Sequence, residues 1–134
     1  MDYIYLRSKK EKAIDKGKEI TRIRKIGAIA ISDFKYDRKA IIGTICSKHD
    51  NFSKKRAIEI LQERLEISSI DSSDIRSDLK RKVLDPNILK KVTLKSYLKT
   101  NNLFQPALKQ NIDLERAEVS FQRLKERVLN KESE

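Results

Sequence analysis

The sequence predicts an α+β domain, in which an antiparallel β-hairpin or sheet is covered by helices and the C-terminal half is mostly helical. Two features predict this class. Residues 20–32 and 39–47 are rich in β-branched side chains, and the segment between them begins and ends with turn formers. From residue 54 onward, apolar residues recur at helical spacing. The 134 residues fit a single domain, 1–134, with three parts: 1–18, 19–66 and 72–134.

The first part, residues 1–18, is expected to be a flexible basic arm or an edge strand. Residues 3–6 suit a short strand, whereas residues 7–18 are charged and contain Gly17, which favours a loop or a frayed arm. The strand expected next, 20–32, loses its alternation between Ile23 and Ile26. Gly27 then offers a bulge or a bend at that point.

The second part, residues 19–66, joins the hairpin to the best-marked helix start in the chain. Ser53 precedes Lys54, and its hydroxyl can accept a hydrogen bond from a helix N–H that has no partner within the helix. Phe52 occupies the position of a hydrophobic staple. The helix is then predicted to run to residue 66, because helical spacing is kept by Ala57, Ile58, Leu61 and Leu65.

The third part, residues 72–134, follows a Ser- and Asp-rich linker at 68–73. A first helix is predicted from its one-sided apolar stripe and is capped by Ser73 or Asp74; the stripe consists of Ile75, Leu79 and Val83. Asp85 and Pro86 end that helix and begin another, which opens with Ile88, Leu89 and Val92 and closes near Tyr97 and Leu98. An extended conformation over residues 92–95 is the alternative. Residues 101–106 are expected to form a loop.

The last helix is predicted to begin near Asp113 and to carry a regular apolar stripe. The stripe follows alternating spacings of three and four residues and consists of Leu114, Ala117, Phe121, Leu124 and Val128. Two heptads are too few for a free coiled coil. Two interpretations therefore stand: the stripe packs on the sheet, or it forms the interface of a homo-oligomer.

Composition argues against most kinds of catalytic site. His49 and Cys46 are the only histidine and cysteine, so a structural zinc site lacks ligands, and Ser47, His49 and Asp50 lie too close in sequence for a triad. Three glycines cannot build a Gly-rich phosphate loop. We therefore expect no enzyme activity, no cofactor and no metal, with two converging carboxylates holding magnesium as the alternative.

Localisation is predicted from what the sequence does not contain. A single cysteine forms no internal disulfide, and residues 1–6 are too short and too polar for a targeting segment. No stretch approaches the roughly 18 apolar residues that a membrane span needs. A cytoplasmic protein without a membrane partner is the expectation.

The charge is strongly basic and unevenly distributed. The net charge is +11; residues 19–56 carry +6 and residues 80–99 carry +6, while residues 57–79 between them carry −4. Mixed signs are usual on a solvated surface, so these two blocks favour a basic face that binds an anionic ligand. The alternative is a Lys-rich surface that serves solubility.

The principal candidate site lies at the start of the helix predicted from residue 54. Lys54, Lys55 and Arg56 occupy its first turn, where acidic side chains would suit the helix dipole better. Three cations at a helix N-terminus favour a bound phosphate. Arg22, Arg24 and Lys25 are expected to extend the site, as are Arg38 and Lys39 after the turn. The rings of Phe34 and Tyr36 either stack on a base or cap a small core.

A second basic block is expected to form a ridge that suits a phosphate backbone. On a helix, residues 91, 95 and 99 would share one face. An ordinary solvated helix face is the alternative. The ridge consists of Lys80, Arg81, Lys82, Lys91, Lys95 and Lys99, together with Lys90 beside them.

Residues 27–64 carry a resemblance to a known family. A β-hairpin is followed by a helix whose start and first turns include Ser47, Asp50, Phe52, Ser53, Lys54, Lys55, Ile60 and Arg64. This layout resembles that of small phage-encoded proteins, the anti-Thoeris sponges, which join an N-terminal sheet to C-terminal helices and bind cyclic nucleotide immune signals without cleaving them. The resemblance implies phosphate ligation by Lys54, Lys55, Arg56 and Arg64, with Arg116 or Arg123 completing the site at an oligomer interface.

Three functional hypotheses follow. The first is anti-defence by sequestration of a cyclic nucleotide, which needs a compact pocket. The second is sequence-tolerant DNA or RNA binding, which needs a continuous basic face and depends steeply on salt. The third is inhibition of a host protein, for example a defence or nucleic-acid-handling complex whose anionic site the basic face occupies.

Overall fold

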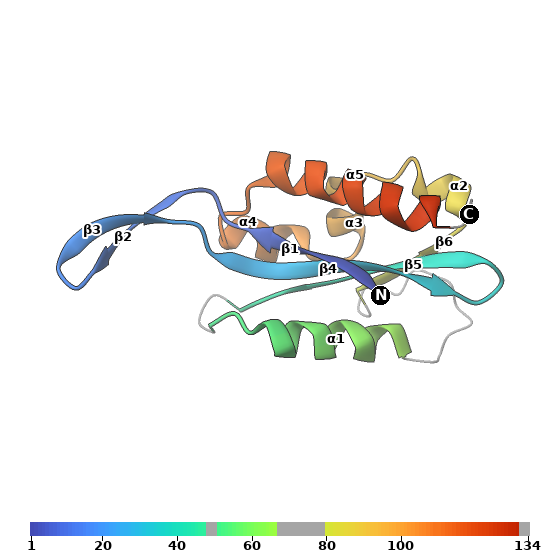
Figure 1. Cartoon of the computed structure of the whole chain (residues 1–134), viewed down its shortest axis with the longest axis horizontal. Coiled ribbons are helices and arrows are strands. Elements are labelled where there is room, and N and C mark those ends of the chain that lie inside the picture. The colour runs from blue at the N-terminus through green and yellow to red at the C-terminus, as the bar shows by residue number, and fades with distance from the viewer. Residues whose placement is uncertain (48–50, 67–79, 132–134) are drawn as a thin grey trace.

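A computed structural model describes residues 1–47, 51–66 and 80–131, and confirms the α+β class. Its main sheet is antiparallel with strand order β1-β4-β5-β6, formed by Asp2–Arg7, Lys25–Phe34, Arg38–Ile45 and Arg81–Leu84. Helix α1 (Lys54–Glu66) covers one face. The other face is covered by the C-terminal helices (Figure 1), α2 (Pro86–Leu89), α3 (Leu94–Thr100), α4 (Phe104–Lys109) and α5 (Leu114–Asn130).

Strands β4 and β5 form the centre of the sheet and are buried on both faces. Ile29 and Ile31 of β4 pack into the larger core beneath the C-terminal helices, whereas Ala28 and Ala30 face α1. This follows from the alternation of side chains along a strand. The small alanines leave room for α1 to approach the sheet, and Leu61 of α1 is fully buried there.

The bulge expected near Gly27 is confirmed, but the strand expected over 20–32 is two strands. Strand β3 (Lys18–Arg22) ends before Ile23, and β4 begins at Lys25. Where β1 pairs with β4, the register shifts: Leu6 is opposite Gly27 and Arg7 is opposite Lys25. A side chain at position 27 would place its Cβ 2.3 Å from the carbonyl oxygen of Thr44, so this position has no room for one.

Residues 7–18 are not a loop, and this expectation was wrong. Strand β2 (Glu11–Asp15) pairs with β3 in a two-stranded ribbon, residues 11–22, that stands away from the body of the molecule (Figure 1). Lys16 and Gly17 at its tip have φ of 51° and 79°. Two consecutive positive φ values suit the tight turns that match strand twist. We refer to residues 11–22 as the ribbon.

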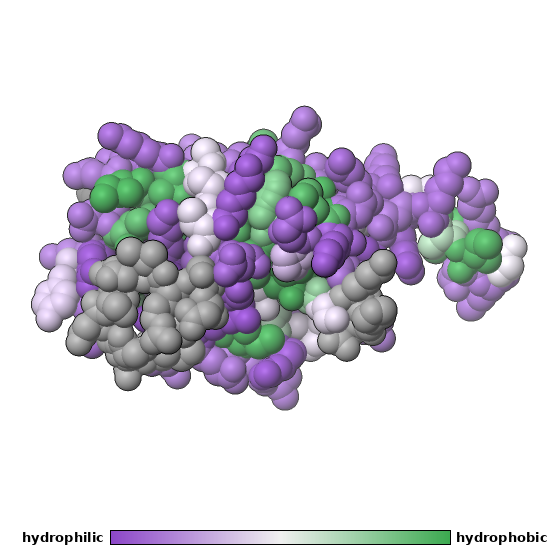
Figure 2. Space-filling view, turned by 180° about the vertical axis from the view of Figure 1, so that it is seen from behind, coloured by the Kyte–Doolittle hydropathy of each residue, from purple (hydrophilic) through white to green (hydrophobic). Residues whose placement is uncertain are grey.

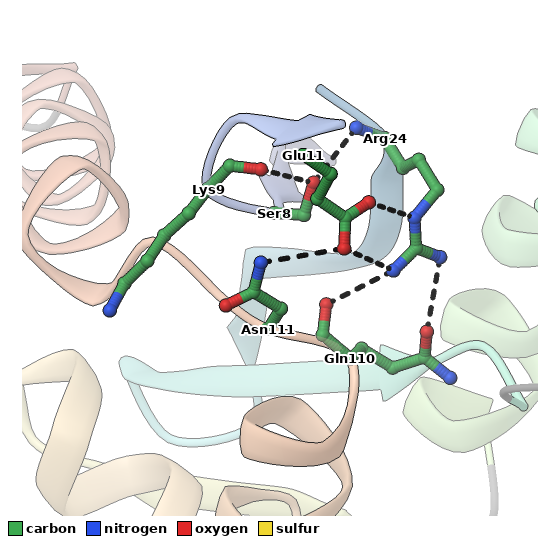
Figure 3. A network of polar contacts seen from close by, with 6 residues as sticks. All are labelled: Ser8, Lys9, Glu11, Arg24, Gln110 and Asn111. Atoms are coloured by element: carbon green, nitrogen blue, oxygen red, sulfur yellow. Dashed lines mark hydrogen bonds and ion pairs between the residues drawn. The ribbon is translucent and has the colours of Figure 1, made fainter. Parts of the chain in front are cut away.

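The ribbon is tied to the body at its base by a polar network (Figure 3). The guanidinium of Arg24 donates to both carboxylate oxygens of Glu11, at 2.6 and 3.3 Å, and to the side chain of Gln110 at 3.2 Å. The buried Ser8 hydroxyl accepts from the Arg24 amide at 3.0 Å, and the Lys9 amide donates to the carbonyl of Asn111 at 2.9 Å. These bonds fix the direction in which the ribbon leaves the sheet.

The predicted start of α1 is confirmed. The Arg56 amide donates to the Ser53 hydroxyl at 3.2 Å, as an N-cap requires. Phe52 packs against the small core that contains Ala57, which is the staple contact.

The helix expected to carry Ile75, Leu79 and Val83 does not include Val83. Val83 lies in β6, where it pairs with Ala40 of β5, because the edge of the sheet offers hydrogen bonds to this segment. The rest of that expected helix, Ile75 and Leu79 with the caps Ser73 and Asp74, lies outside the described residues, as does the whole linker at 68–73.

The helix expected from Pro86 to Leu98 is two helices. Pro86 begins α2 as predicted, but α2 ends at Leu89, and Thr93 caps a new helix, α3, by accepting from the Ser96 amide at 3.1 Å. Thr93 itself is extended, but the extended alternative for residues 92–95 is wrong at Leu94 and Lys95, which are helical. The loop expected over 101–106 gives way to α4 at Phe104.

Helix α5 matches its prediction. The Asp113 carboxylate accepts from the Arg116 amide at 3.2 Å and caps the helix. Its apolar stripe packs on the sheet within the chain, with four members buried: Ala117, Phe121, Leu124 and Val128. The stripe is therefore not a free surface for a second copy. In the same helix Lys125 is buried, and its ammonium donates to three main-chain carbonyls at the end of α2 and beyond: Leu89, Lys90 and Val92.

Candidate anion-binding groove

A basic groove lies at the end of the sheet where the ribbon joins it and α1 begins. Its volume is about 520 Å³, which is within the usual range for small-molecule sites. Five cationic side chains line it: Arg7, Arg22, Arg24, Lys25 and Lys54. We call this the basic groove. A second hollow of about 450 Å³ shares part of its wall, namely Cys46, Ser47, Asn51 and Phe52.

The ring of Tyr5 brings two lysines together in this groove. The ammonium of Lys25 lies 4.7 Å from the ring centroid and that of Lys54 lies 5.7 Å from it. Tyr5 is held in place by Phe52, whose ring meets it edge-on at a centroid distance of 5.8 Å. The start of β4 and the first turn of α1 thus converge on the ring of Tyr5, which β1 carries.

Among the described residues around it, no carboxylate balances the charge of this lysine pair. Hydrogen bonding to Lys54, partial burial, and the charges of Lys54 and Arg7 lower the pKa of Lys25 from its ordinary value. In the described part of the chain, no carboxylate forms an ion pair with Arg7, Lys25 or Lys54. Repulsion between neighbouring cations is relieved when an anion binds between them.

Arg24 has a different role from the other groove cations. It is paired with Glu11, which lies on β2, and also reaches the Gln110 carbonyl at 3.3 Å (Figure 3). The pairing raises the pKa of Arg24, and the Arg24 guanidinium lowers the pKa of Glu11. Arg24 therefore positions the groove wall and the ribbon. Arg22, on β3, is the strand partner of Glu11 but forms no ion pair with it in the described part of the chain.

Of the three cations in the first turn of α1, only Lys54 lines the basic groove. Lys55 is exposed, and Arg56 lines the neighbouring hollow and pairs with Glu59 at 3.4 Å and Glu63 at 3.5 Å. The internal pairing of Arg56 offsets the cost of a cation at a helix N-terminus.

Arg64 does not join this group. It lies ten residues, or about 15 Å, further along α1. Its guanidinium donates to the carbonyl of Gly43, and burial lowers its pKa. Arg64 therefore ties α1 to the sheet instead of facing the basic groove.

Phe34 and Tyr36 lie at the opposite end of the sheet from the groove. The β4–β5 turn that carries them follows the pair Phe34–Arg38, whereas the groove lies near the pair Gly27–Ile45 (Figure 1). Tyr36 is 85% exposed. Phe34 is contacted by two arginines, with the guanidinium of Arg38 at 5.7 Å and that of Arg81 at 5.1 Å from its ring.

The second basic block does not form one ridge. Arg81 is buried in β6, where it donates to the carbonyls at the end of α1, while Lys80 precedes β6 and Lys82 lies within it. Lys91 lies before α3 begins. Only Lys95 and Lys99 share a helix face, and both lie over the Phe104 ring, at 5.9 and 5.1 Å.

The sequence analysis missed two residues of the site: Arg7, which lines the basic groove, and Tyr5, whose ring lies beneath two of its lysines. Both lie on β1, which pairs with β4 and so reaches the groove only through the folded sheet. The sequence did contain a signal for them: Tyr5 and Arg7 flank Leu6, which is buried, so on a strand their side chains share the face opposite to Leu6. Arg116 of α5 lines a small neighbouring hollow with Tyr5, Arg7 and Asp113.

No protein-family model, curated protein or solved structure matches this chain. The described residues contain no group of three His, Cys, Asp or Glu side chains placed to hold a metal ion. Among the same residues, none of the helices combines the length and the apolar character that crossing a bilayer demands.

Proposed function

We propose that this protein binds a phosphate-bearing ligand in the basic groove without converting it, and that the ligand is a nucleotide signal which the protein sequesters. The observation that carries the proposal is the convergence of Lys25 and Lys54 on the Tyr5 ring with no ion-paired carboxylate among the described residues. An anion held between these ammonium groups would replace their repulsion with two charge-assisted hydrogen bonds.

The groove also offers contacts for the rest of a nucleotide. The ring of Phe52 lines the groove beside the cations, and an aromatic face stacks on bases of any sequence. Its volume suits a compact ligand. A cyclic nucleotide is the first choice because of the resemblance to the phage sponges, and in that case the protein acts in anti-defence.

The test is calorimetric titration with a panel of cyclic and linear nucleotides, followed by recovery of the ligand from the denatured complex. Recovery of an unchanged ligand is expected. The double variant Lys25→Gln/Lys54→Gln should bind at least tenfold more weakly, which corresponds to about 1.4 kcal/mol. The matched control is Lys90→Gln/Lys91→Gln, which removes the same charge from two exposed positions beyond α2.

Two results would overturn the proposal. One is a well-folded Lys25→Gln/Lys54→Gln protein that binds as tightly as the control. The other is the absence of binding to any nucleotide; if nucleic acid does not bind either, the third hypothesis remains, inhibition of a host protein through its anionic site.

A further inference from the structure

The ribbon has almost no role in the packing of this chain. Every residue of β3 is exposed, and of β2 only Glu11 and Ala13 are partly covered. Ile14, near the tip, is 80% exposed. Figure 2 shows an apolar patch on the part of the molecule that extends from the body, surrounded by hydrophilic side chains. An isolated two-stranded hairpin is at best marginally stable in water. A feature this exposed and this firmly anchored suits contact with a partner.

The unpaired charge of the ribbon is positive. Two of its three carboxylates are already paired: Glu11 with Arg24, and Glu19 with Lys12 at 3.6 Å. The cations at and near the tip, Lys16 and Lys18, have only Asp15 beside them. Lys9 and Lys10 add exposed charge where the ribbon leaves β1. The complementary partner is therefore an anion that extends along the ribbon.

One face of the ribbon leads directly into the basic groove. Lys18, Ile20 and Arg22 lie at alternating positions of β3 and so share a face, along which Lys18 and Arg22 are about 13 Å apart. Arg22 also lines the basic groove, beside Lys25. A row of cations thus runs from the tip of the ribbon to the Lys25–Lys54 pair, which is longer than a single nucleotide needs.

We propose that the ribbon and the basic groove together bind double-stranded DNA, with the ribbon in the major groove and a backbone phosphate in the basic groove. This proposal rests on the proposed function, because the basic groove has to accept a phosphate. The major groove of B-DNA admits a two-stranded β-ribbon, whereas that of an RNA duplex is too deep and narrow. Contacts made mainly to phosphates give binding that tolerates any sequence.

The test compares three variants of the full chain by fluorescence anisotropy with a mixed-sequence DNA duplex, the matching RNA duplex and the nucleotide panel, at several salt concentrations. Lys16→Gln/Lys18→Gln alters the ribbon and keeps Gly17. Lys25→Gln/Lys54→Gln alters the basic groove. The control, Lys90→Gln/Lys91→Gln, removes the same charge at the end of the molecule opposite the ribbon (Figure 1).

The ribbon variant should bind duplex DNA about tenfold more weakly near 0.1 M salt, and its salt slope should fall by about 2. Its affinity for small nucleotides should stay within about twofold of the wild type. The groove variant should lose affinity for both. Circular dichroism establishes that each variant is folded.

The outcomes separate the two proposals. If the wild type binds a nucleotide but not duplex DNA, or if the ribbon variant binds DNA as the control does, the DNA proposal fails and the proposed function stands. Equal affinity for the RNA duplex would overturn the placement in the major groove. If neither nucleotides nor DNA bind, both proposals fail.

Discussion

Lys25 and Lys54 lie 29 positions apart in the sequence, yet their ammonium groups lie over the same Tyr5 ring, at 4.7 and 5.7 Å from its centroid. One comes from the start of β4 and the other from the first turn of α1. The aromatic face attracts both cations and partly offsets their mutual repulsion. The remaining repulsion is the energetic basis of the anion binding that we propose for this groove.

The lowered pKa of Lys25 gives the first prediction. Because Lys54 is the main cause of the lowering, Lys54→Gln should raise the pKa of Lys25 towards its ordinary value. Binding of a phosphate in the groove should shift it in the same direction and cause proton uptake at alkaline pH. As pH rises, the affinity for the phosphate should therefore begin to fall at a lower pH than it would if Lys25 had its ordinary pKa.

NMR titration of the lysine side-chain ammonium groups measures this effect. Lys55→Gln is the control, because Lys55 does not line the groove. A pKa of Lys25 that is the same in the wild type and in Lys54→Gln would show that the two ammonium groups do not interact.

The bulge at Gly27 gives a prediction about stability. Gly27→Ala would place a methyl group 2.3 Å from the Thr44 carbonyl oxygen, and a central strand cannot move easily, so we expect a loss of about 3 kcal/mol in the free energy of unfolding. Gly43→Ala would instead meet mostly the ends of side chains, with Ile29 Cδ1 at 2.6 Å, and should cost about 1 kcal/mol. Urea denaturation measures the loss of unfolding free energy in both variants. A larger loss in Gly43→Ala than in Gly27→Ala would contradict this account.

Buried Lys125 gives a third prediction. Its ammonium is the shared donor to the carbonyls of Leu89, Lys90 and Val92, and burial lowers its pKa. Lys125→Met keeps the aliphatic stem but leaves these acceptors without that donor, which should destabilise the fold by about 3 kcal/mol. Arg123→Met, an exposed position on the same helix, should change stability by less than about 0.5 kcal/mol. Equal stability of the two variants would show that the hydrogen bonds of Lys125 do not stabilise the fold.

The base of the ribbon gives a fourth prediction, which concerns dynamics. Arg24 lowers the pKa of Glu11, so the Glu11–Arg24 pair stabilises the fold above the ordinary carboxyl pKa of 4.5 and loses that contribution as pH falls through the lowered value. Glu11→Gln should therefore speed amide hydrogen exchange in the ribbon while leaving β4 and β5 unchanged. Acidification of the wild type should have the same local effect. Uniform acceleration across the sheet would show that the pair stabilises the whole domain.

The elements that sequence alone predicted are those with a strong local signal. The start of α1 rests on Ser53 and Phe52, and α5 rests on the Asp113 cap and a stripe of regular spacing. In each case neighbouring residues in the chain carry the information. The hairpin of β4 and β5 was equally clear, because both strands are almost entirely apolar and β-branched or small.

The ribbon and the edge strand β6 were missed for a physical reason. The ribbon has no buried face, so its strands show no apolar alternation, and a charged segment with Gly17 is as typical of a loop. Strand β6 spans four residues and is defined by its hydrogen bonds to β5, which no local pattern reveals.

The candidate site was predicted only in part because it is built across the sheet. Lys54 was found from its place in α1, and Arg22 and Arg24 from the run of cations near them. Arg7 lines the groove, and Tyr5 lies beneath its lysines, because β1 pairs with β4 and skips the ribbon in strand order, which is a property of topology.

The most direct test of the central claim is an amide NMR titration of the wild-type protein with the nucleotide that binds most tightly in the panel. The account predicts that the largest shifts cluster at Tyr5, Arg7, Arg22–Ile26 and Lys54, and that the amides around Lys95 and Lys99 barely move. Shifts centred on α3, or at the Tyr36 end of the sheet, would contradict the claim that the basic groove is the binding site.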